Sequence, residues 1–247
     1  MSISPASISS SSRSPSDSAS SGQRDETIAV FDLDGTITTR DTTAAYLLGY
    51  LREHPRRLAS FLPAAISALG FAAGLADRAA LKRAAIRAVL GDATRDEISA
   101  WTDRFVAWCL QALVRPVARA RIKAHADAGH HLILATASLD LHVPPIARAL
   151  GFSDVICTKL AWTRDRKISG DLDGDNMRGH NKLAAVQRAV ARLERVPRSA
   201  TVIAYSDHHA DLPLLHWADQ AVAVNPTRRL AATAGIEGIA IEDWGRP

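Results

Sequence analysis

The stretch TIAVFDLDGT, residues 27–36, decides the predicted fold. Its first part, TIAVF, is mostly apolar and favours β structure without polar alternation, which indicates a short strand buried on both faces. Asp32 and Asp34 follow directly, and Gly35 and Thr36 turn the chain. Because residues two apart in an extended segment point to the same side, both carboxylates are expected at the carboxyl end of this strand. Taken alone, the segment Asp34-Gly35 also fits an Asp-Gly turn that closes a hairpin.

Further apolar runs predict more buried strands. They are HLILA (131–135), DVICT (154–158), TVIAY (201–205) and AVAV (221–224). Helical stretches intervene, such as 144–150 and 181–194, so strands and helices alternate along the chain. This alternation predicts an α/β fold with a parallel sheet and helices on both sides. In such sheets the reactive groups gather at the carboxyl ends of the strands.

The composition limits the function classes. With 247 residues and 47% hydrophobic content, the chain can bury a full core as one large domain or one domain with an insertion. The net charge of +4 favours anionic partners, but the basic residues are dispersed and only 5% of residues are aromatic, so no nucleic-acid groove is expected. Cys109 and Cys157 form no CxxC pair, so neither a disulfide framework nor a thiolate metal site is expected. The N-terminus has no apolar run behind a basic start and does not resemble a secretory signal, so a cytoplasmic location is predicted. The sequence predicts no oligomeric state.

Two segments depart from the α/β pattern. Residues 1–24 are rich in serine and carry almost no apolar bulk, so they are predicted to be a disordered tail. Residues 42–115 are rich in alanine and leucine with a helical period, which predicts a helical insertion after the first strand. Trp101, Phe105 and Trp108 share one face of a helix there, and we interpret them as core of the insertion rather than a stacking site.

An uncharged run within the insertion, residues 58–76, leaves three interpretations open. It is a buried or paired helix, a segment that contacts a membrane surface, or a membrane span, and its length is near the lower limit for a span. Pro63, Gly70, Gly74 and many alanines make it only moderately hydrophobic, which favours the first interpretation.

Polar residues also follow the other predicted strands. Thr136 ends HLILA with Ser138 behind it, and SDHHAD after TVIAY supplies Asp207 and Asp211. Lys182 opens the helix 181–194, where a cation and free backbone amides face an anion. Each has an ordinary explanation, such as a strand exit, a solvated lysine or a helix cap. Jointly they form an acid, hydroxyl, base and acid series suited to phosphoryl chemistry.

The series resembles the motifs of the haloacid dehalogenase superfamily of phosphohydrolases. FDLDGT matches the first motif, Thr136 in LILATAS the second, Lys182 in GHNK the third, and SDHHAD the fourth. The resemblance spans residues 27–226. Within the superfamily, the sequence is similar to subfamily IB, which contains phosphoserine phosphatase and a phosphatidylglycerophosphate phosphatase. It implies a Rossmann-like core, residues 25–41 and 116–247, and a helical C1 cap, residues 42–115.

The resemblance also implies roles for these residues. Asp32 would attack phosphorus to give an aspartyl phosphate, and Asp34 would act as the general acid and base. Mg²⁺ would be held by Asp32, by the backbone carbonyl of Asp34 and by Asp207, with Asp211 assisting from outside the ligand shell. The residues expected to bind the phosphoryl group are Gly35, Thr36, Thr136 and Lys182.

The substrate is less well specified. Asp41 lies where phosphoserine phosphatases carry a glutamate, and Arg83 or Arg87 could supply the arginine for a substrate carboxylate. The expected substrate is therefore a small or a lipid-linked phosphate monoester, with phosphoserine and phosphatidylglycerophosphate as the specific alternatives. Two other hypotheses remain, a non-enzymatic phospho-acceptor of the receiver type and a membrane-anchored interaction protein.

A second DLDG, residues 171–174, lies between a predicted hairpin, TRDRKISG (163–170), and the turn that leads to Lys182. No buried strand precedes it, and it lacks the closing glutamate of an EF-hand loop, so we interpret it as a solvated connection. The pairs His130-His131 and His208-His209 lack zinc-protease spacing, and the second pair is expected at the mouth of the pocket.

Overall fold

The structure is a computed structural model that describes residues 26–60, 78–193 and 199–245. The predicted disordered tail, residues 1–24, and most of the uncharged run, residues 61–76, lie outside the described residues. No described helix is both long enough and apolar enough to cross a bilayer.

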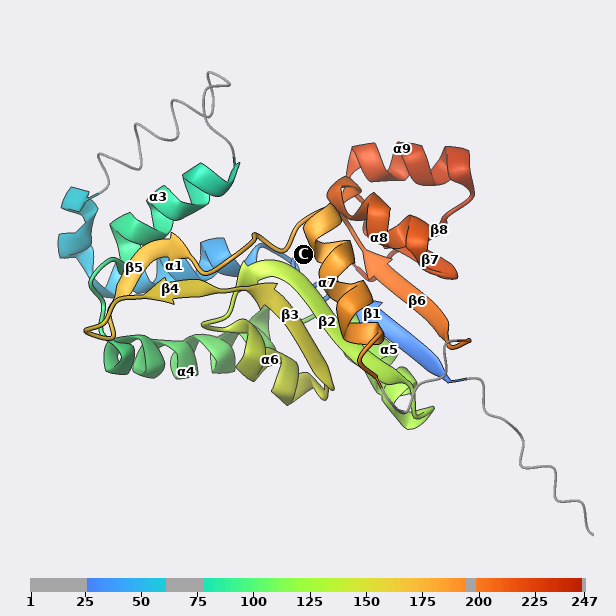
Figure 1. The fold of residues 1–247 in the computed structure, drawn as a ribbon, viewed down its shortest axis with the longest axis horizontal. Coiled ribbons are helices and arrows are strands. Elements are labelled where there is room, and N and C mark those ends of the chain that lie inside the picture. The colour runs from blue at the N-terminus through green and yellow to red at the C-terminus, as the bar shows by residue number, and fades with distance from the viewer. Residues whose placement is uncertain (1–25, 61–77, 194–198, 246–247) are drawn as a thin grey trace, which may run out of the picture.

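A six-stranded parallel sheet forms the centre of the fold (Figure 1), in the order β3-β2-β1-β6-β7-β8. The strands are β1 (Thr27–Phe31), β2 (His131–Leu139), β3 (Asp154–Thr158), β6 (Thr201–Ser206), β7 (Gln220–Val224) and β8 (Ala240–Glu242). Val30 of β1 pairs with Ile133 on one side and with Ala204 on the other. The strand order reverses at β1, so the loop after β1 opens at the switch point where α/β sheets bind ligands.

Helices cover both faces of the sheet. Side chains of β1 alternate between the faces, with Phe31 on one and Val30 on the other. The Phe31 face packs against α5 (Pro116–Asp127) and α6 (Val143–Leu150). The Val30 face packs against α7 (His180–Val190), α8 (Leu212–Trp217) and α9 (Arg228–Glu237). The predicted parallel α/β fold is confirmed, and β8 is a strand that the sequence did not indicate.

The described elements between the loop after β1 and α5 are helices. They are α1 (Thr42–Glu53), the short 3-10 helix η1 (Pro55–Ser60), α3 (Arg78–Leu90) and α4 (Arg95–Ala112). Asp41 caps α1, because its Oδ1 accepts a 2.7 Å hydrogen bond from the Ala44 amide. Thr94 and Glu97 form a capping box at the start of α4. The boundaries at residues 42 and 115 stay a prediction.

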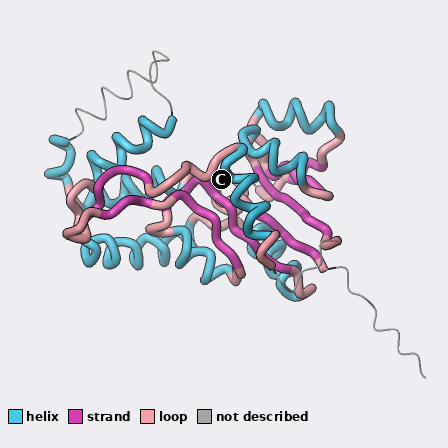
Figure 2. Tube along the Cα trace, in the orientation of Figure 1, coloured by secondary structure: helices cyan, strands magenta, loops and turns pink. Residues whose placement is uncertain are grey.

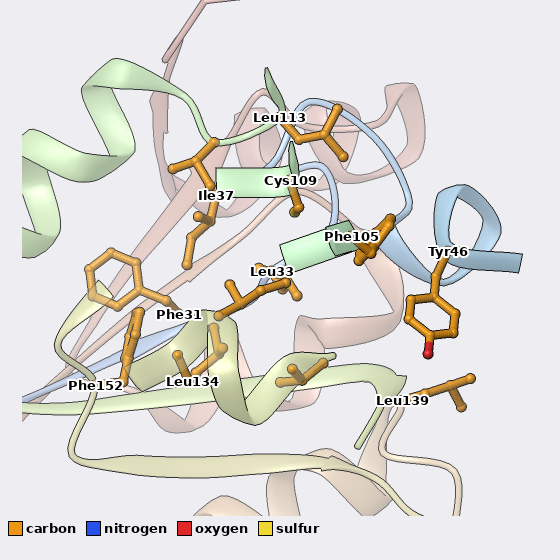
Figure 3. Close-up of a cluster of buried hydrophobic side chains, with 14 of the residues drawn as sticks. Phe31, Leu33, Ile37, Tyr46, Phe105, Cys109, Leu113, Leu134, Leu139 and Phe152 are labelled. Atoms are coloured by element: carbon orange, nitrogen blue, oxygen red, sulfur yellow. The ribbon is translucent and has the colours of Figure 1, made fainter. Parts of the chain in front are cut away.

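One buried apolar cluster joins the sheet to these helices. Figure 3 shows it running from Phe31 and Phe152 through Leu33 and Ile37 to Phe105. Leu33 and Ile37 belong to the loop after β1, so the chain that carries Asp32 and Asp34 is itself packed between core and insertion. This packing fixes the position of the loop.

Two of the three aromatic residues expected in the core of the insertion lie in this cluster. Trp101 and Phe105 are buried, whereas Trp108 keeps 45% of its surface exposed. The prediction is confirmed for the first two and is wrong for Trp108, which lies on the outer side of α4.

A separate antiparallel hairpin is formed by β4 (Leu160–Trp162) and β5 (Ile168–Leu172). It packs against α3 (Figures 1 and 2), and the Arg95 guanidinium at the start of α4 lies 4.5 Å from the centre of the Trp162 ring. Asp171, in the second DLDG, lies within β5 and forms an exposed 2.8 Å ion pair with Arg87. The predicted hairpin is confirmed, but the interpretation of the second DLDG as only a solvated connection is wrong, because its first half is a strand.

Candidate active site

A cavity of about 660 Å³ lies at the carboxyl ends of the central strands. The loop after β1, the end of β2, the first turn of α7 and the loop after β6 meet there. The cavity brings together most residues singled out in the sequence, namely Asp32, Asp34, Gly35, Asp41, Thr136, Lys182, Asp207 and Asp211.

Lys182 joins two carboxylates at the base of the cavity. Its ammonium lies 2.8 Å from Oδ1 of Asp32 and 2.6 Å from Oδ2 of Asp211. Ser206 donates a further 2.8 Å hydrogen bond to the same oxygen of Asp211. Burial alone would lower the pKa of Lys182, but the carboxylates of Asp211 and Asp32 outweigh it and raise that pKa. The lysine is therefore a permanent cation beside Asp32.

Asp34 has both carboxyl oxygens engaged. The Thr42 amide donates to Oδ1 at 2.7 Å, and the Ser138 hydroxyl donates to Oδ2 at 2.5 Å. Ser138 is in turn contacted by the hydroxyl groups of Thr42 at 3.1 Å and Thr43 at 2.8 Å. Burial raises the pKa of Asp34 although these hydrogen bonds act to lower it. A carboxyl group with a raised pKa is suited to giving and taking a proton near neutral pH.

The other carboxyl groups of the site repel one another. Burial, together with Asp211 and Asp34, raises the pKa of Asp32 to about 7 despite the ammonium of Lys182. Burial, together with Asp32 and Asp211, raises the pKa of Asp207 to about 8. The one lysine thus leaves negative charge in the cavity that a further cation would compensate.

Gly35 allows Asp207 to reach the site. Its φ of +81° lies in the left-handed region, and a Cβ at this position would lie 2.3 Å from Oδ2 of Asp207. The backbone of the DLDG turn and the carboxyl group of Asp207 are therefore in direct contact. A side chain at position 35 would push them apart.

The donor set fits a hard cation such as Mg²⁺. In the described part of the chain, no three His, Cys, Asp or Glu side chains are grouped so that they alone could hold a metal ion. Mg²⁺ needs only one or two carboxylates when backbone, water and substrate oxygens supply the rest. Asp32 and Asp207 line the cavity and provide these two carboxylates.

Three of the predicted site residues do not line the cavity. The Thr36 side chain is fully buried, and its hydroxyl has no hydrogen-bond partner among the described residues. Arg87 is exposed and paired with Asp171, and Arg83, although on the same helix, does not reach the cavity either. The structure therefore does not support a phosphate contact by the Thr36 side chain or a substrate contact by these arginines.

Several lining residues were missed in the sequence. They are Arg40, Lys82, Asn176 and Arg178, and His208 lies at the cavity as expected whereas His209 does not. Lys82 precedes Arg83 on α3, and Arg178 follows the second DLDG. Their spacing carries no motif, so only the fold reveals that they face Asp32.

Comparisons with known proteins agree with this geometry. The family of haloacid dehalogenase-like hydrolases matches residues 29–216. The chain is 33% identical to the protein CicA of Caulobacter vibrioides over 78% of this chain and 83% of that protein. It is 29% identical to a probable phosphatase of Mycobacterium tuberculosis over 91% of this chain and 77% of that one. A solved phosphoserine phosphatase, a phospho-aspartyl intermediate analogue, has the same fold, with a TM-score of 0.61 at 16% identity over 90% of this chain and 94% of that one.

Proposed function

Since the chain belongs to the haloacid dehalogenase-like hydrolases and is a phosphatase, we propose that it hydrolyses phosphate monoesters through an aspartyl phosphate on Asp32. The observation that carries this proposal is the buried contact of Lys182 with Asp32 and Asp211 at the carboxyl end of β1. The Lys182 cation holds the carboxylate of Asp32 at the cavity, and a carboxylate held in this way is suited to attack on phosphorus.

Asp32 would form the new bond. One carboxylate oxygen is held by Lys182, and the other is left to approach the phosphorus atom. When the oxygen of Asp32 bonds to phosphorus, the bond to the leaving alcohol breaks and the alcohol oxygen needs a proton. Asp34, on the same loop and with a raised pKa, would supply that proton.

Asp34 would then serve as the base of the second half-reaction. After the alcohol has left, the ionised carboxylate of Asp34 takes a proton from water as the water oxygen attacks the phosphoryl group. The bond between phosphorus and Asp32 breaks, which releases inorganic phosphate and restores the free carboxylate. The hydrogen bonds from Thr42 and Ser138 would hold Asp34 in place during both transfers.

Lys182 and Thr136 would bind the phosphoryl oxygens. Both are buried at the cavity, and the Lys182 cation would stabilise negative charge as it spreads over the transferring group. Asp32, the Asp34 carbonyl and Asp207 would hold Mg²⁺, which would supply further positive charge to the site. Asp211 would keep Lys182 in position through its ion pair.

The proposed substrate is a phosphorylated small molecule or a lipid phosphate. Asp41 lines the cavity, but its carboxylate already caps α1, and neither Arg83 nor Arg87 reaches the site, which weakens the phosphoserine alternative. Contact of residues 58–76 with a membrane surface and a cytoplasmic location stay predictions.

The test is phosphate release from 4-nitrophenyl phosphate. We expect turnover with Mg²⁺, loss of turnover after chelation with EDTA, and recovery when Mg²⁺ is added back. Asp32→Asn should abolish turnover and leave the melting temperature close to that of the wild type. Asp127→Asn, at an exposed position at the end of α5, serves as the matched control. Phosphate release by Asp32→Asn at the wild-type rate would overturn the assignment of Asp32.

A further inference from the structure

Lys82 and Arg178 are two of the cations that line the cavity, and neither forms an ion pair with a described carboxylate. Lys82 projects from α3, and Arg178 lies in the segment between β5 and α7. Lys82 donates to the carbonyl of Ala137 and, at 3.2 Å, to Oδ1 of Asn176, both of which are neutral groups. Nη2 of Arg178 lies 3.2 Å from the ring nitrogens of His208. No carboxylate within the described ranges forms a salt bridge with either cation.

The nearby carboxylates have other partners. Asp34 and Asp41 are close enough to affect Lys82 electrostatically, yet the oxygens of Asp34 accept from Thr42 and Ser138 and Oδ1 of Asp41 caps α1. Asp32 and Asp211 are both paired with Lys182. None of these four carboxylates is paired with Lys82 or Arg178.

Holding the pair together in this way is unfavourable in the absence of an anion. Burial lowers the pKa of Lys82 to about 8, and Arg178 acts in the same direction because the two positive charges repel. A half-buried ammonium that only touches neutral acceptors keeps much of its desolvation cost. An anion placed between the two side chains would remove both penalties.

The position of Lys82 fixes where such an anion would lie. Its ammonium contacts the carbonyl of Ala137, the neighbour of Thr136, which is expected to bind the phosphoryl group. The anion would thus lie beside the phosphoryl site, toward α3 and the hairpin. The leaving group of a bound monoester would therefore extend toward Lys82.

We propose that Lys82 and Arg178 form a second anion-binding subsite, and that the natural substrate is a phosphate monoester whose leaving group carries another anionic group. This inference rests on the proposed function. The anionic group is a carboxylate or a phosphodiester, and both would accept charge-assisted hydrogen bonds from a lysine and an arginine.

The experiment compares kcat/KM for three kinds of substrate. 4-Nitrophenyl phosphate and glycerol 3-phosphate have leaving groups without charge, phosphoserine and phosphoglycolate carry a carboxylate, and phosphatidylglycerophosphate in micelles carries a phosphodiester. We expect the wild type to prefer one of the two doubly anionic kinds by about tenfold or more. The preferred kind identifies the source of the second anion.

Substitutions at the subsite locate the preference. Lys82→Met and Arg178→Met should each lower kcat/KM for the preferred substrate by about tenfold to a hundredfold more than for glycerol 3-phosphate, mainly through KM. Lys82→Arg should retain most of the preference. Arg83→Gln, one position along α3 but away from the cavity, is the matched control and should behave as the wild type on every substrate.

The outcomes separate this inference from the proposed function. Hydrolysis of 4-nitrophenyl phosphate without any preference for a doubly anionic substrate would overturn the subsite while leaving the phosphatase intact. An equal loss on all substrates in Lys82→Met would instead place Lys82 on the phosphoryl group and also overturn the subsite. If no monoester is hydrolysed, the proposed function fails, and calorimetric binding of phosphoglycolate to the wild type and to Lys82→Met still tests the subsite.

Discussion

Ser138 donates a hydrogen bond of 2.5 Å to Oδ2 of Asp34, so the end of β2 holds the carboxyl group that we propose as general acid and base. Ser138→Ala should lower kcat by about tenfold to a hundredfold, since a hydrogen bond to a charged group is lost and Asp34 can rotate. KM should change little, because Ser138 is not proposed to hold the phosphoryl group. Steady-state kinetics with 4-nitrophenyl phosphate measure both constants.

A serine outside the site provides the control for that substitution. Ser169 in β5 donates a 3.0 Å hydrogen bond to the carbonyl of Ala161, away from the cavity. Ser169→Ala should leave kcat unchanged. An equal fall in kcat for the two variants would contradict a positioning role for Ser138.

Lys182→Met should destabilise the fold as well as abolish activity. Among the described residues, the ammonium is the one cation paired with Asp32 and Asp211, and leaving these buried carboxylates without it costs about 3–5 kcal/mol. Urea denaturation without Mg²⁺ measures the change in the free energy of unfolding. Lys123→Met, which removes an exposed pair with Asp127, should cost at most about 1 kcal/mol. Similar losses in the two variants would argue against a buried charge cluster.

Gly35→Ala should impair the metal site. The added Cβ would lie 2.3 Å from Oδ2 of Asp207, so the carboxyl group must move away from the DLDG turn. We expect a weaker apparent affinity for Mg²⁺ in the activity assay and a lower kcat. Gly174, the matching glycine of the second DLDG, has a φ of +89° but nothing within 4 Å of its Cβ position. Gly174→Ala therefore imposes the backbone strain alone, and an equal effect on Mg²⁺ affinity would refute the contact as the cause.

Two buried histidines should make a contribution to stability that is lost in acid, opposite in sign to that of Asp32 and Asp207, whose raised pKa values favour the folded state as the pH falls. Burial lowers the pKa of His142 from 6.5 to about 3, and burial with the neighbouring His130 and Arg121 lowers the pKa of His125 from 6.5 to about 4. Above pH 6.5 both histidines are neutral in the folded and unfolded chains, so their contribution is fully present. As the pH falls below 6.5 the unfolded chain takes up the protons first, and the free energy of unfolding falls by about 1.4 kcal/mol per pH unit for each histidine.

Urea denaturation between pH 7 and pH 4.5 measures this slope. His142→Gln should be less stable at pH 7 and should have a smaller slope than the wild type. His216→Gln, which alters an exposed ring paired with Glu237, should keep the wild-type slope. An unchanged slope in His142→Gln would show that this histidine is not buried in its neutral form.

The sequence was sufficient for five of the six strands of the sheet and for residues at their ends. Unalternating apolar runs predict buried parallel strands, and the side chains that follow them converge because all carboxyl ends lie on one edge. Asp32, Thr136 and Asp207 were found by this reasoning. β8 was not found, because a three-residue strand at an exposed edge has too few apolar residues to form a pattern.

The residues that line the cavity on the side of α3 could not be predicted from the sequence in the same way. Lys82 lies in an alanine-rich helix with Arg83 and Arg87 beside it, and a lysine there has the appearance of a solvated residue. Which of the three cations faces the site depends on how α3 packs against β5 and α1, and the sequence does not specify that packing. The second DLDG is a similar case, since its pairing with Arg87 exists only once the hairpin has docked on α3.

The apolar cluster that runs from Phe31 through Leu33 and Ile37 into Phe105 has a consequence for how the protein unfolds and evolves. A cap attached through polar linkers could melt separately or be exchanged between relatives as an independent module. Here the sheet core and the inserted helices share one buried apolar cluster. Calorimetry should therefore record a single cooperative unfolding transition for both. A graft of these helices onto another member of the family would fold only if the loop after β1 were transferred with them.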